Sequence, residues 1–375
     1  MSPFDTPLDR RGTDSLKWGK YAGRDILPLW VADMDFAAPP AVLAALRRRV
    51  DAGVFGYGQA WPSLEAAVVD HLAEAHGWVI ESDWIVWLPG LVSGLNIACR
   101  AVEGEVLTAT PVYPPFLSAP RLAGRTPRQV ELIRRNDRWQ WDMTALAAAA
   151  ADTRLFLLCH PHNPVGRCWQ EDELRALADF AAERDLVVCS DEIHSGLILD
   201  ADKRHIPFAS LSADAARRSI TLLAPSKTFN IPGLACALAV IPDAALRRRF
   251  HTVMAGIVPH VNVLGLAACE AAYRDGEAWR RELISYLAGN RDRVAAAVAA
   301  CPQVGMSPVE ATYLAWIDVR GLGLTDPARH FEKHGLGLSD GADFGAPGWL
   351  RLNFGCPRAT LDEALRRFAT ACQAT

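Results

Sequence analysis

The chain has 375 residues, of which 50% are hydrophobic, and a formal net charge of −4 at pH 7. A chain of this length and composition can bury a large core, and we expect two or three domains. Acidic and basic residues are mixed without a long basic block, which argues against nucleic acid and anionic membranes as partners.

The nine cysteines form no C-x-x-C pair and no grouping with zinc-ligand spacing, so we expect no metal site and a reducing compartment. The N-terminus lacks the apolar segment of a signal peptide. The longest apolar runs, such as 234–241, are too short to cross a bilayer. These features predict a soluble, cytoplasmic protein.

In chain order, the first 50 residues are interrupted by prolines, and residues 29–36 are expected to be a loop because two acids lie between apolar residues. Short apolar runs then alternate with longer helical patterns. The predicted strands are 105–109, 154–159, 186–190, 219–223 and 236–241. The predicted helices are 62–76, 92–102, 145–151, 171–184, 260–274 and 278–299. From 312 to 356 the order is strand, helix and strand. This alternation is typical of an α/β protein whose largely parallel sheet is covered by helices on both faces.

Three polar residues follow successive predicted strands: Asn163, Asp191 and Lys227. Ligands of α/β sheets bind at the carboxyl ends of the strands, so these residues are site candidates. A desolvated lysine has a lowered pKa, and its amine can then attack an aldehyde; the alternative is an ordinary surface lysine. Asp191 can pair with a cationic ring nitrogen such as that of pyridoxal 5′-phosphate (PLP), and the Asn163 amide can donate to a phenolate oxygen.

Five further residues complete the candidate site. Leu91 and Val92 open a predicted helix, whose N–H groups can bind phosphate. Tyr113 offers a flat face for a ring, although aromatic residues often only fill a core. His194 is expected either to orient Asp191, to line the pocket or to be purely structural. Arg351 lies in an apolar, strand-like run, where a buried guanidinium needs either a substrate carboxylate or an internal ion pair.

Taken together, these residues resemble the fold-type I PLP enzymes of the class I/II aminotransferase group, and more closely the MalY/PatB-type cystathionine β-lyases. The resemblance covers the chain from about residue 4 to the C-terminus. It is carried by the segments 27–36, 53–57, 110–116, 162–166, 190–194, 226–230 and 351–358.

The resemblance implies a role for each matching position. Lys227 would hold the cofactor as a Schiff base and act as the catalytic base. The cofactor contacts would come from Asp191 at the pyridine nitrogen, Asn163 at O3′, Tyr113 and His194 beside the ring, and Leu91, Val92 and Ser226 at the phosphate. The substrate contacts would come from Arg351, Asp33, Tyr113 and Asn163. Tyr57 would reach the phosphate bound by a neighbouring subunit, which implies a homodimer.

The sequence departs from the wider family at four positions. Ala224 and Ala235 replace a serine and an arginine that many aminotransferases place near the phosphate, and loss of that arginine is also a feature of the lyase-like subfamily. His160 stands where the family usually has Asn, and Gly196 where an acid is common. We expect the last two to affect the rim of the pocket and therefore the choice of substrate.

The expected activity is β-elimination from cystathionine or another S-substituted cysteine, giving a thiol, pyruvate and ammonia. Transamination uses the same residues and remains an alternative, as does a regulatory protein that binds PLP and acts through a protein partner. The expected domains are a large cofactor-binding domain of residues 48–285 and a smaller one of residues 1–47 and 286–375.

Overall fold

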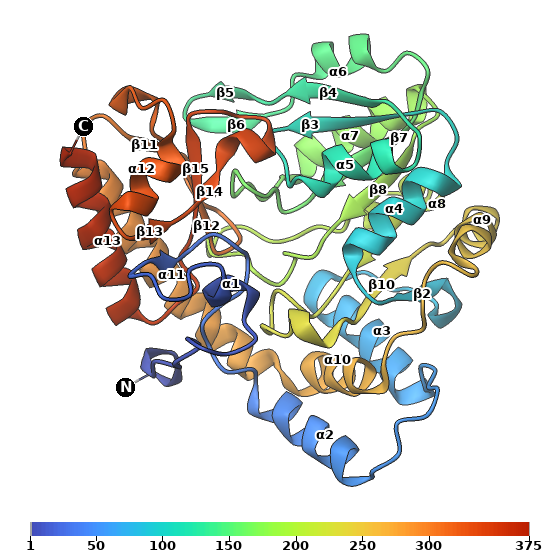
Figure 1. Cartoon of the computed structure of the whole chain (residues 1–375). Helices are drawn as coiled ribbons and strands as arrows, with labels where there is room; N and C mark the ends of the chain where they lie inside the picture. Colours follow the sequence, from blue (N-terminus) through green and yellow to red (C-terminus); the bar gives the residue numbers. More distant parts are fainter. Residues whose placement is uncertain (1, 375) are drawn as a thin grey trace.

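The computed structural model describes residues 2–374, which form an α/β protein around a seven-stranded sheet (Figure 1). Every neighbouring pair is parallel except those made by β10, which is antiparallel to β2 and to β9. The strand order is β2 (Ile85–Leu88), β10 (Ala237–Val240), β9 (Ser219–Leu223), β8 (Val187–Asp191), β7 (Thr153–Cys159), β3 (Glu105–Thr110) and β4 (Pro127–Glu131). The predicted α/β class with a mostly parallel sheet is confirmed.

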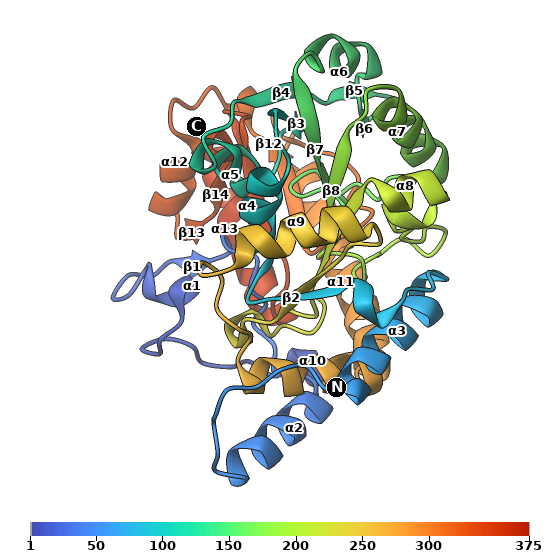
Figure 2. The same ribbon diagram turned by 90° about the vertical axis from the view of Figure 1, so that its right-hand side faces the viewer.

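Helices cover both faces of this sheet. Side chains of a strand alternate between the two faces, and both faces carry buried apolar side chains. Val106 and Leu155 pack toward one group of helices, whereas Leu107 and Phe156 pack toward the other. The first group is α4 (Leu91–Ala101), α5 (Pro115–Leu122) and α9 (Ala244–Met254). The second is α6 (Met143–Ala149), α7 (Glu171–Glu183) and α8 (Ala213–Arg217). Turned by 90°, the molecule shows α4 and α9 on the side away from α7 and α8 (Figure 2).

Two more helices pack beside β2 and β10. They are α3 (Pro62–His76) and α10 (Val263–Asp275), which share a hydrophobic core with these strands. A third helix, α2 (Pro40–Asp51), packs on α10. The predicted helix 62–76 matches α3, and the predicted helix 260–274 begins later, because the Asn262 side chain caps its first turn. The other predicted strands and helices agree with the structure to within two residues at each end.

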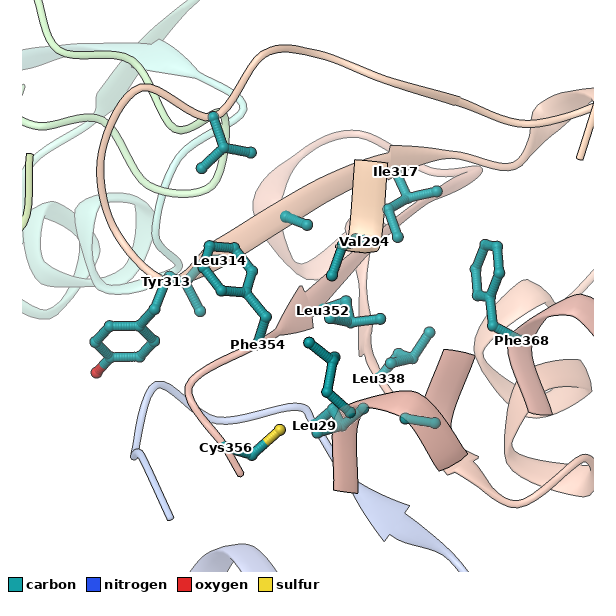
Figure 3. Close-up of a cluster of buried hydrophobic side chains, with 14 of the residues drawn as sticks. Leu29, Val294, Tyr313, Leu314, Ile317, Leu338, Leu352, Phe354, Cys356 and Phe368 are labelled. Carbon is teal, nitrogen blue, oxygen red and sulfur yellow. The ribbon is translucent and has the colours of Figure 1, made fainter. Parts of the chain in front are cut away.

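A second, smaller sheet is antiparallel and lies at the C-terminal end of the chain. Its order is β11 (Gly305–Met306), β12 (Leu314–Asp318), β15 (Trp349–Asn353) and β14 (Ser339–Asp340). It packs with α11 (Glu277–Ala299), α12 (Pro327–Lys333) and α13 (Arg358–Gln373). Figure 3 shows this core, in which Leu352 and Phe354 lie near Val294 and Leu338.

The N-terminal segment joins this smaller core. Leu29 is buried in it, and β1 (Leu27–Pro28) pairs in parallel with β13 (Leu336–Gly337) (Figure 3). The remaining elements are α1 (Leu16–Gly19) and the hairpin of β5 (Ile133–Arg135) with β6 (Arg138–Gln140), together with six short 3-10 turns: Pro3–Asp5, Ser82–Trp84, Phe208–Ser210, Pro232–Leu234, Arg320–Leu322 and Gly341–Phe344. Within residues 2–374, a search for helices that could span a bilayer finds none.

Candidate active site

A cavity of about 220 Å³ opens where β7 and β8 end and where the chain leaves β9. Because these three strands are adjacent and parallel, their carboxyl ends meet at one edge of the sheet. The cavity also reaches the smaller sheet, which contributes β15. Its polar lining comes from Tyr113, Asn163, Asp191, His194, Lys227 and Arg351.

Lys227 follows β9 and points its amine into this cavity. The Nζ atom donates to the Ala32 carbonyl oxygen at 2.6 Å. Burial lowers the lysine pKa to about 8, and the nearby Arg351 guanidinium acts in the same direction, while the carboxylates of Asp33 and Asp191 oppose both. A larger share of the amine is therefore neutral near pH 8 than in a free lysine, as a nucleophile requires.

Asp191 is the last residue of β8, and its carboxylate faces the cavity. It accepts one hydrogen bond, from the Ile193 N–H at 3.2 Å. Burial raises its pKa to about 7, against the lowering effects of this hydrogen bond and of Lys227. A buried carboxylate without a hydrogen-bonded cation is costly, so the site favours a ligand that brings a positive charge to it.

Glu192, the next residue, turns to the opposite side of the strand end. Its carboxylate accepts hydrogen bonds from the Ser190 hydroxyl at 2.8 Å and the Phe208 N–H at 3.0 Å, and it lies 2.7 Å from His205 Nε2. The alternation of side chains along a strand separates the two carboxyls. Only Asp191 is therefore placed to contact a ligand of the cavity.

Arg351 lies in the middle of β15 and is buried. One of its terminal nitrogens donates to Asn163 Oδ1 at 3.0 Å, and the other donates to the Trp30 carbonyl at 2.8 Å. No hydrogen-bond partner reaches its Nε, which is buried. Within the described chain its partners are neutral, so the alternative of an internal ion pair is wrong, and the guanidinium retains its charge for an anionic ligand. Asn163 uses Oδ1 for this contact, which leaves its Nδ2 as the atom that can donate to a ligand.

Tyr113 and His194 form walls of the cavity beside these polar groups. Burial, together with the charge of Asp191, raises the Tyr113 pKa, so its ring stays neutral. Burial lowers the His194 pKa to about 3, and the positive charges of Lys227 and Arg351 add to this effect. Of the expected roles for His194, lining the pocket agrees with its position; its Nδ1 is buried without a partner.

The remaining end of the cavity is less polar. Leu91, Val92 and Ser226 line it, and Gly90 precedes α4 without a side-chain cap. The first N–H groups of α4 are therefore available to an anion. Ala224 and Ala235 also line this end, so the two departures noted in the sequence fall within the cavity itself.

Two expected site residues lie outside this lining. The Tyr57 side chain is fully exposed to solvent in the single chain. The Asp33 carboxylate is held by Arg10 through two hydrogen bonds of 2.9 Å, although it lies close enough to affect the pKa of Lys227. Sequence reasoning missed Tyr313, whose hydroxyl donates to the Ala32 carbonyl at 3.0 Å. The sequence contains no signal for this contact, because the acceptor is a backbone atom.

The comparisons with known proteins agree with this geometry. Residues 24–368 match the family model of aminotransferase class I and II. The chain belongs to this family. Cystathionine beta-lyase PatB of Bacillus subtilis is 38% identical, over 98% of this chain and 99% of the relative.

Two solved structures extend the comparison with the aminotransferase class I and II family. The crystal structure of OvoB has a TM-score of 0.97 and 49% identity, over 99% of each chain. The PLP-bound C-S lyase of Staphylococcus hominis has a TM-score of 0.92 and 29% identity, over 99% of this chain and 98% of that one. The cofactor of this protein is PLP.

The residues present fit this cofactor. The unpaired Asp191 carboxylate suits a protonated pyridine nitrogen, and the Lys227 amine suits the aldehyde. The uncapped end of α4 suits the phosphate. The cofactor's ring has a flat aromatic neighbour in Tyr113.

Proposed function

We propose that this protein is a PLP-dependent carbon–sulfur β-lyase, which converts cystathionine or another S-substituted cysteine to a thiol, pyruvate and ammonia. The observation that carries the proposal is that three groups line one cavity: the Lys227 amine, the Asp191 carboxylate and the Arg351 guanidinium. The names of PatB and of the Staphylococcus hominis enzyme support elimination as the reaction.

Arg351 binds the substrate carboxylate through its unpartnered Nε and an adjacent nitrogen. This fixes the α-carbon near Lys227, whose neutral amine removes the Cα proton. PLP supplies an electron-withdrawing ring that accepts the electron pair left on Cα. Asp191 keeps a proton on the ring nitrogen by its negative charge.

The carbon–sulfur bond then breaks at Cβ, and the sulfur leaves with the bonding electron pair. The Lys227 ammonium is placed to return a proton, either to the departing sulfur or to solvent. The three-carbon fragment takes up water and yields pyruvate and ammonia. The overall reaction consumes one water and needs no oxidant.

Transamination is the second candidate, and the family that matches the chain favours it. The test is to incubate the purified holoenzyme with L-cystathionine in the absence of any 2-oxoacid, and to measure pyruvate and free thiol. We expect equal amounts of the two products. A protein that forms no pyruvate from cystathionine or S-alkylcysteines, but transfers amino groups once a 2-oxoacid is added, would be an aminotransferase.

Replacement of Lys227 by Ala gives the matched control. Without the amine there is no covalent attachment of the cofactor and no base for the Cα proton, so we expect turnover to disappear together with the visible absorbance of the bound cofactor. Full activity of Lys227→Ala would contradict the role of this residue.

We also propose a homodimer in which Tyr57 of one subunit contacts the cofactor phosphate of the other. Support comes from the exposure of three neighbouring side chains, Val54, Phe55 and Tyr57. Among residues 2–374, the only cations of the cavity lining are Lys227 and Arg351, and both are assigned to other contacts. Residues 48–285 would form the cofactor domain, and residues 1–47 with 286–375 a smaller one that closes on the substrate. None of the nine cysteines, all of which lie within residues 2–374, forms a disulfide in the structure, and this supports a reducing, cytoplasmic location.

A further inference from the structure

Residues 30–36, here called the strap, cross the active site without helix or strand structure. Such a segment must satisfy its backbone groups with side chains from elsewhere. Toward the cavity, the Trp30 carbonyl binds Arg351 and Ser339, and the Ala32 carbonyl binds Lys227 and Tyr313. The two residues most important for the proposed reaction therefore both donate to the strap.

The strap is also tied to the body of both sheets. The Asn353 side chain of β15 donates to the carbonyls of Val31 at 2.7 Å and Asp33 at 2.9 Å. Asn230, three residues after Lys227, donates to the carbonyls of Met34 and Phe36 and accepts from the Met34 N–H. These bonds fix its two ends.

A group of charged residues holds the strap from its other side. Lys17 is fully buried, and its Nζ donates to Asp35 Oδ2 at 2.7 Å and to the Asp33 carbonyl at 2.8 Å. Arg10 donates to both carboxylate oxygens of Asp33 and to Asp35 Oδ1, each at 2.9 Å. Two cations face two carboxylates, so the group is neutral as a whole. We call the side chains of Arg10, Lys17 and Asp35 the clamp; Asp35 is the strap's own residue in it, and it accepts from both cations.

We propose that the clamp positions the strap, so that the Ala32 carbonyl holds the Lys227 amine and the Trp30 carbonyl holds the Arg351 guanidinium in the geometry that the reaction needs. The clamp residues are not part of the cavity lining, so they are positioning residues. The activity part of this inference rests on the proposed function, whereas its effect on Lys227 requires only cofactor binding.

The order of the bonds explains how the effect is transmitted. Arg10 holds Asp33, the residue directly after Ala32, and Lys17 holds the Asp33 carbonyl. Loss of these bonds frees the peptide that carries the Ala32 oxygen. A weaker acceptor stabilises the charged form of Lys227 less, so the pKa of this lysine falls further.

The test uses Arg10→Met, because Arg10 is partly exposed and Asp35 keeps Lys17 and Trp18 as partners in its absence. The first measurement is the rate at which the cofactor-free protein attaches PLP covalently, as a function of pH. We expect the midpoint of this profile to move by about 0.5 to 1 unit. Two effects act on it: the weaker Ala32 acceptor lowers the pKa of Lys227, and the Asp33 carboxylate, left without Arg10, raises it. We also expect kcat/KM for cystathionine to fall about 10- to 100-fold, since small misplacements of reacting groups are costly.

Arg291→Met is the matched control. Arg291 has a similar exposure, pairs with Asp200, and also donates to a backbone carbonyl, that of Val309, but it has no contact with the strap. Both variants should lose some thermal stability, and only Arg10→Met should move the pH midpoint. Arg10→Lys keeps the positive charge but loses the bidentate contact with Asp33, so its pH midpoint should lie between those of the wild type and of Arg10→Met.

The double variant Lys17→Met with Asp35→Asn removes the buried pair without leaving an isolated charge. Because it keeps the net charge, only the weaker Ala32 acceptor acts on Lys227, and the midpoint should move to lower pH. A wild-type pH profile in both Arg10→Met and the double variant, with only their melting temperatures lowered, would overturn the proposal. A wild-type protein that has no activity toward cystathionine would instead contradict the proposed substrate. The pH measurement, which requires only cofactor binding, would remain valid.

Discussion

The two ends of the cofactor cavity are built in different ways. The ring end has an amine, a buried carboxylate, an amide and a guanidinium, each within a strand or in the loop that follows one. The phosphate end has the start of α4, Ser226 and two alanines, and the only cations that residues 2–374 add to the cavity lining are Lys227 and Arg351. A single chain therefore supplies the groups that act on the substrate, while the phosphate is left to backbone N–H groups, to Ser226 and, in the proposed homodimer, to Tyr57 of the neighbouring subunit.

After the loss of Lys227, the largest expected effect at the ring end comes from Asp191→Asn. The neutral amide cannot hold a proton on the pyridine nitrogen, so we expect kcat for pyruvate formation to fall about 100- to 1000-fold, as for loss of one partner of a buried ion pair. Glu192→Gln changes the adjacent carboxyl, which points away from the cavity, and is the control. Equal losses in both variants would contradict the assignment of Asp191.

The next effect concerns the pH dependence of Lys227. Burial favours its neutral form, and its pKa of about 8 implies that covalent attachment of PLP to the cofactor-free protein accelerates as pH rises through 8. At pH 7.5 the neutral fraction should be about 200 times that of a free lysine. A profile that rises only near pH 10 would show that the amine is not desolvated.

At the phosphate end, Tyr57→Phe tests the proposed contact between subunits. Loss of one hydrogen bond to a charged phosphate should weaken PLP binding about tenfold, with little change in the pH profile of Lys227. The measurements are the PLP dissociation constant and the mass in solution. Unchanged affinity, or a protein that is monomeric and fully active, would show that the phosphate is held by one chain.

The smallest effect is expected for Ser226→Ala. Its hydroxyl is one neutral donor among several N–H groups, so PLP affinity should fall about two- to fivefold, with kcat preserved. A titration of the cofactor-free variant with PLP measures this directly. A loss as large as that of Tyr57→Phe would mean that the chain's own groups dominate the phosphate end.

Much of the fold was predictable, because apolar periodicity marks the buried strands and the amphipathic helices. The convergence of Asn163, Asp191 and Lys227 was predictable for a related reason: parallel strands end at one edge of the sheet. The sequence did not predict which of the two adjacent carboxyls, Asp191 or Glu192, faces the cavity. That depends on the side to which each side chain points at the end of β8.

The strap and its clamp could not be predicted in the same way. Lys17 lies in a polar, Pro-punctuated region in which lysines are usually exposed, yet its side chain is fully buried. The acceptors of Lys227, Arg351 and Tyr313 are backbone carbonyls, which every residue has. Only their positions in space give them a role.

One consequence follows from the strap being continuous backbone. Arg351 comes from the smaller sheet and Lys227 from the loop after the larger one, yet their acceptors, the Trp30 and Ala32 carbonyls, are only two residues apart. Covalent bond lengths limit two residues to a span of about 7 Å, however the sheets move. The distance between Arg351, which binds the substrate, and Lys227, which takes its proton, is thus limited by the short peptide segment that binds both. Small movements of one sheet relative to the other can therefore leave this distance unchanged.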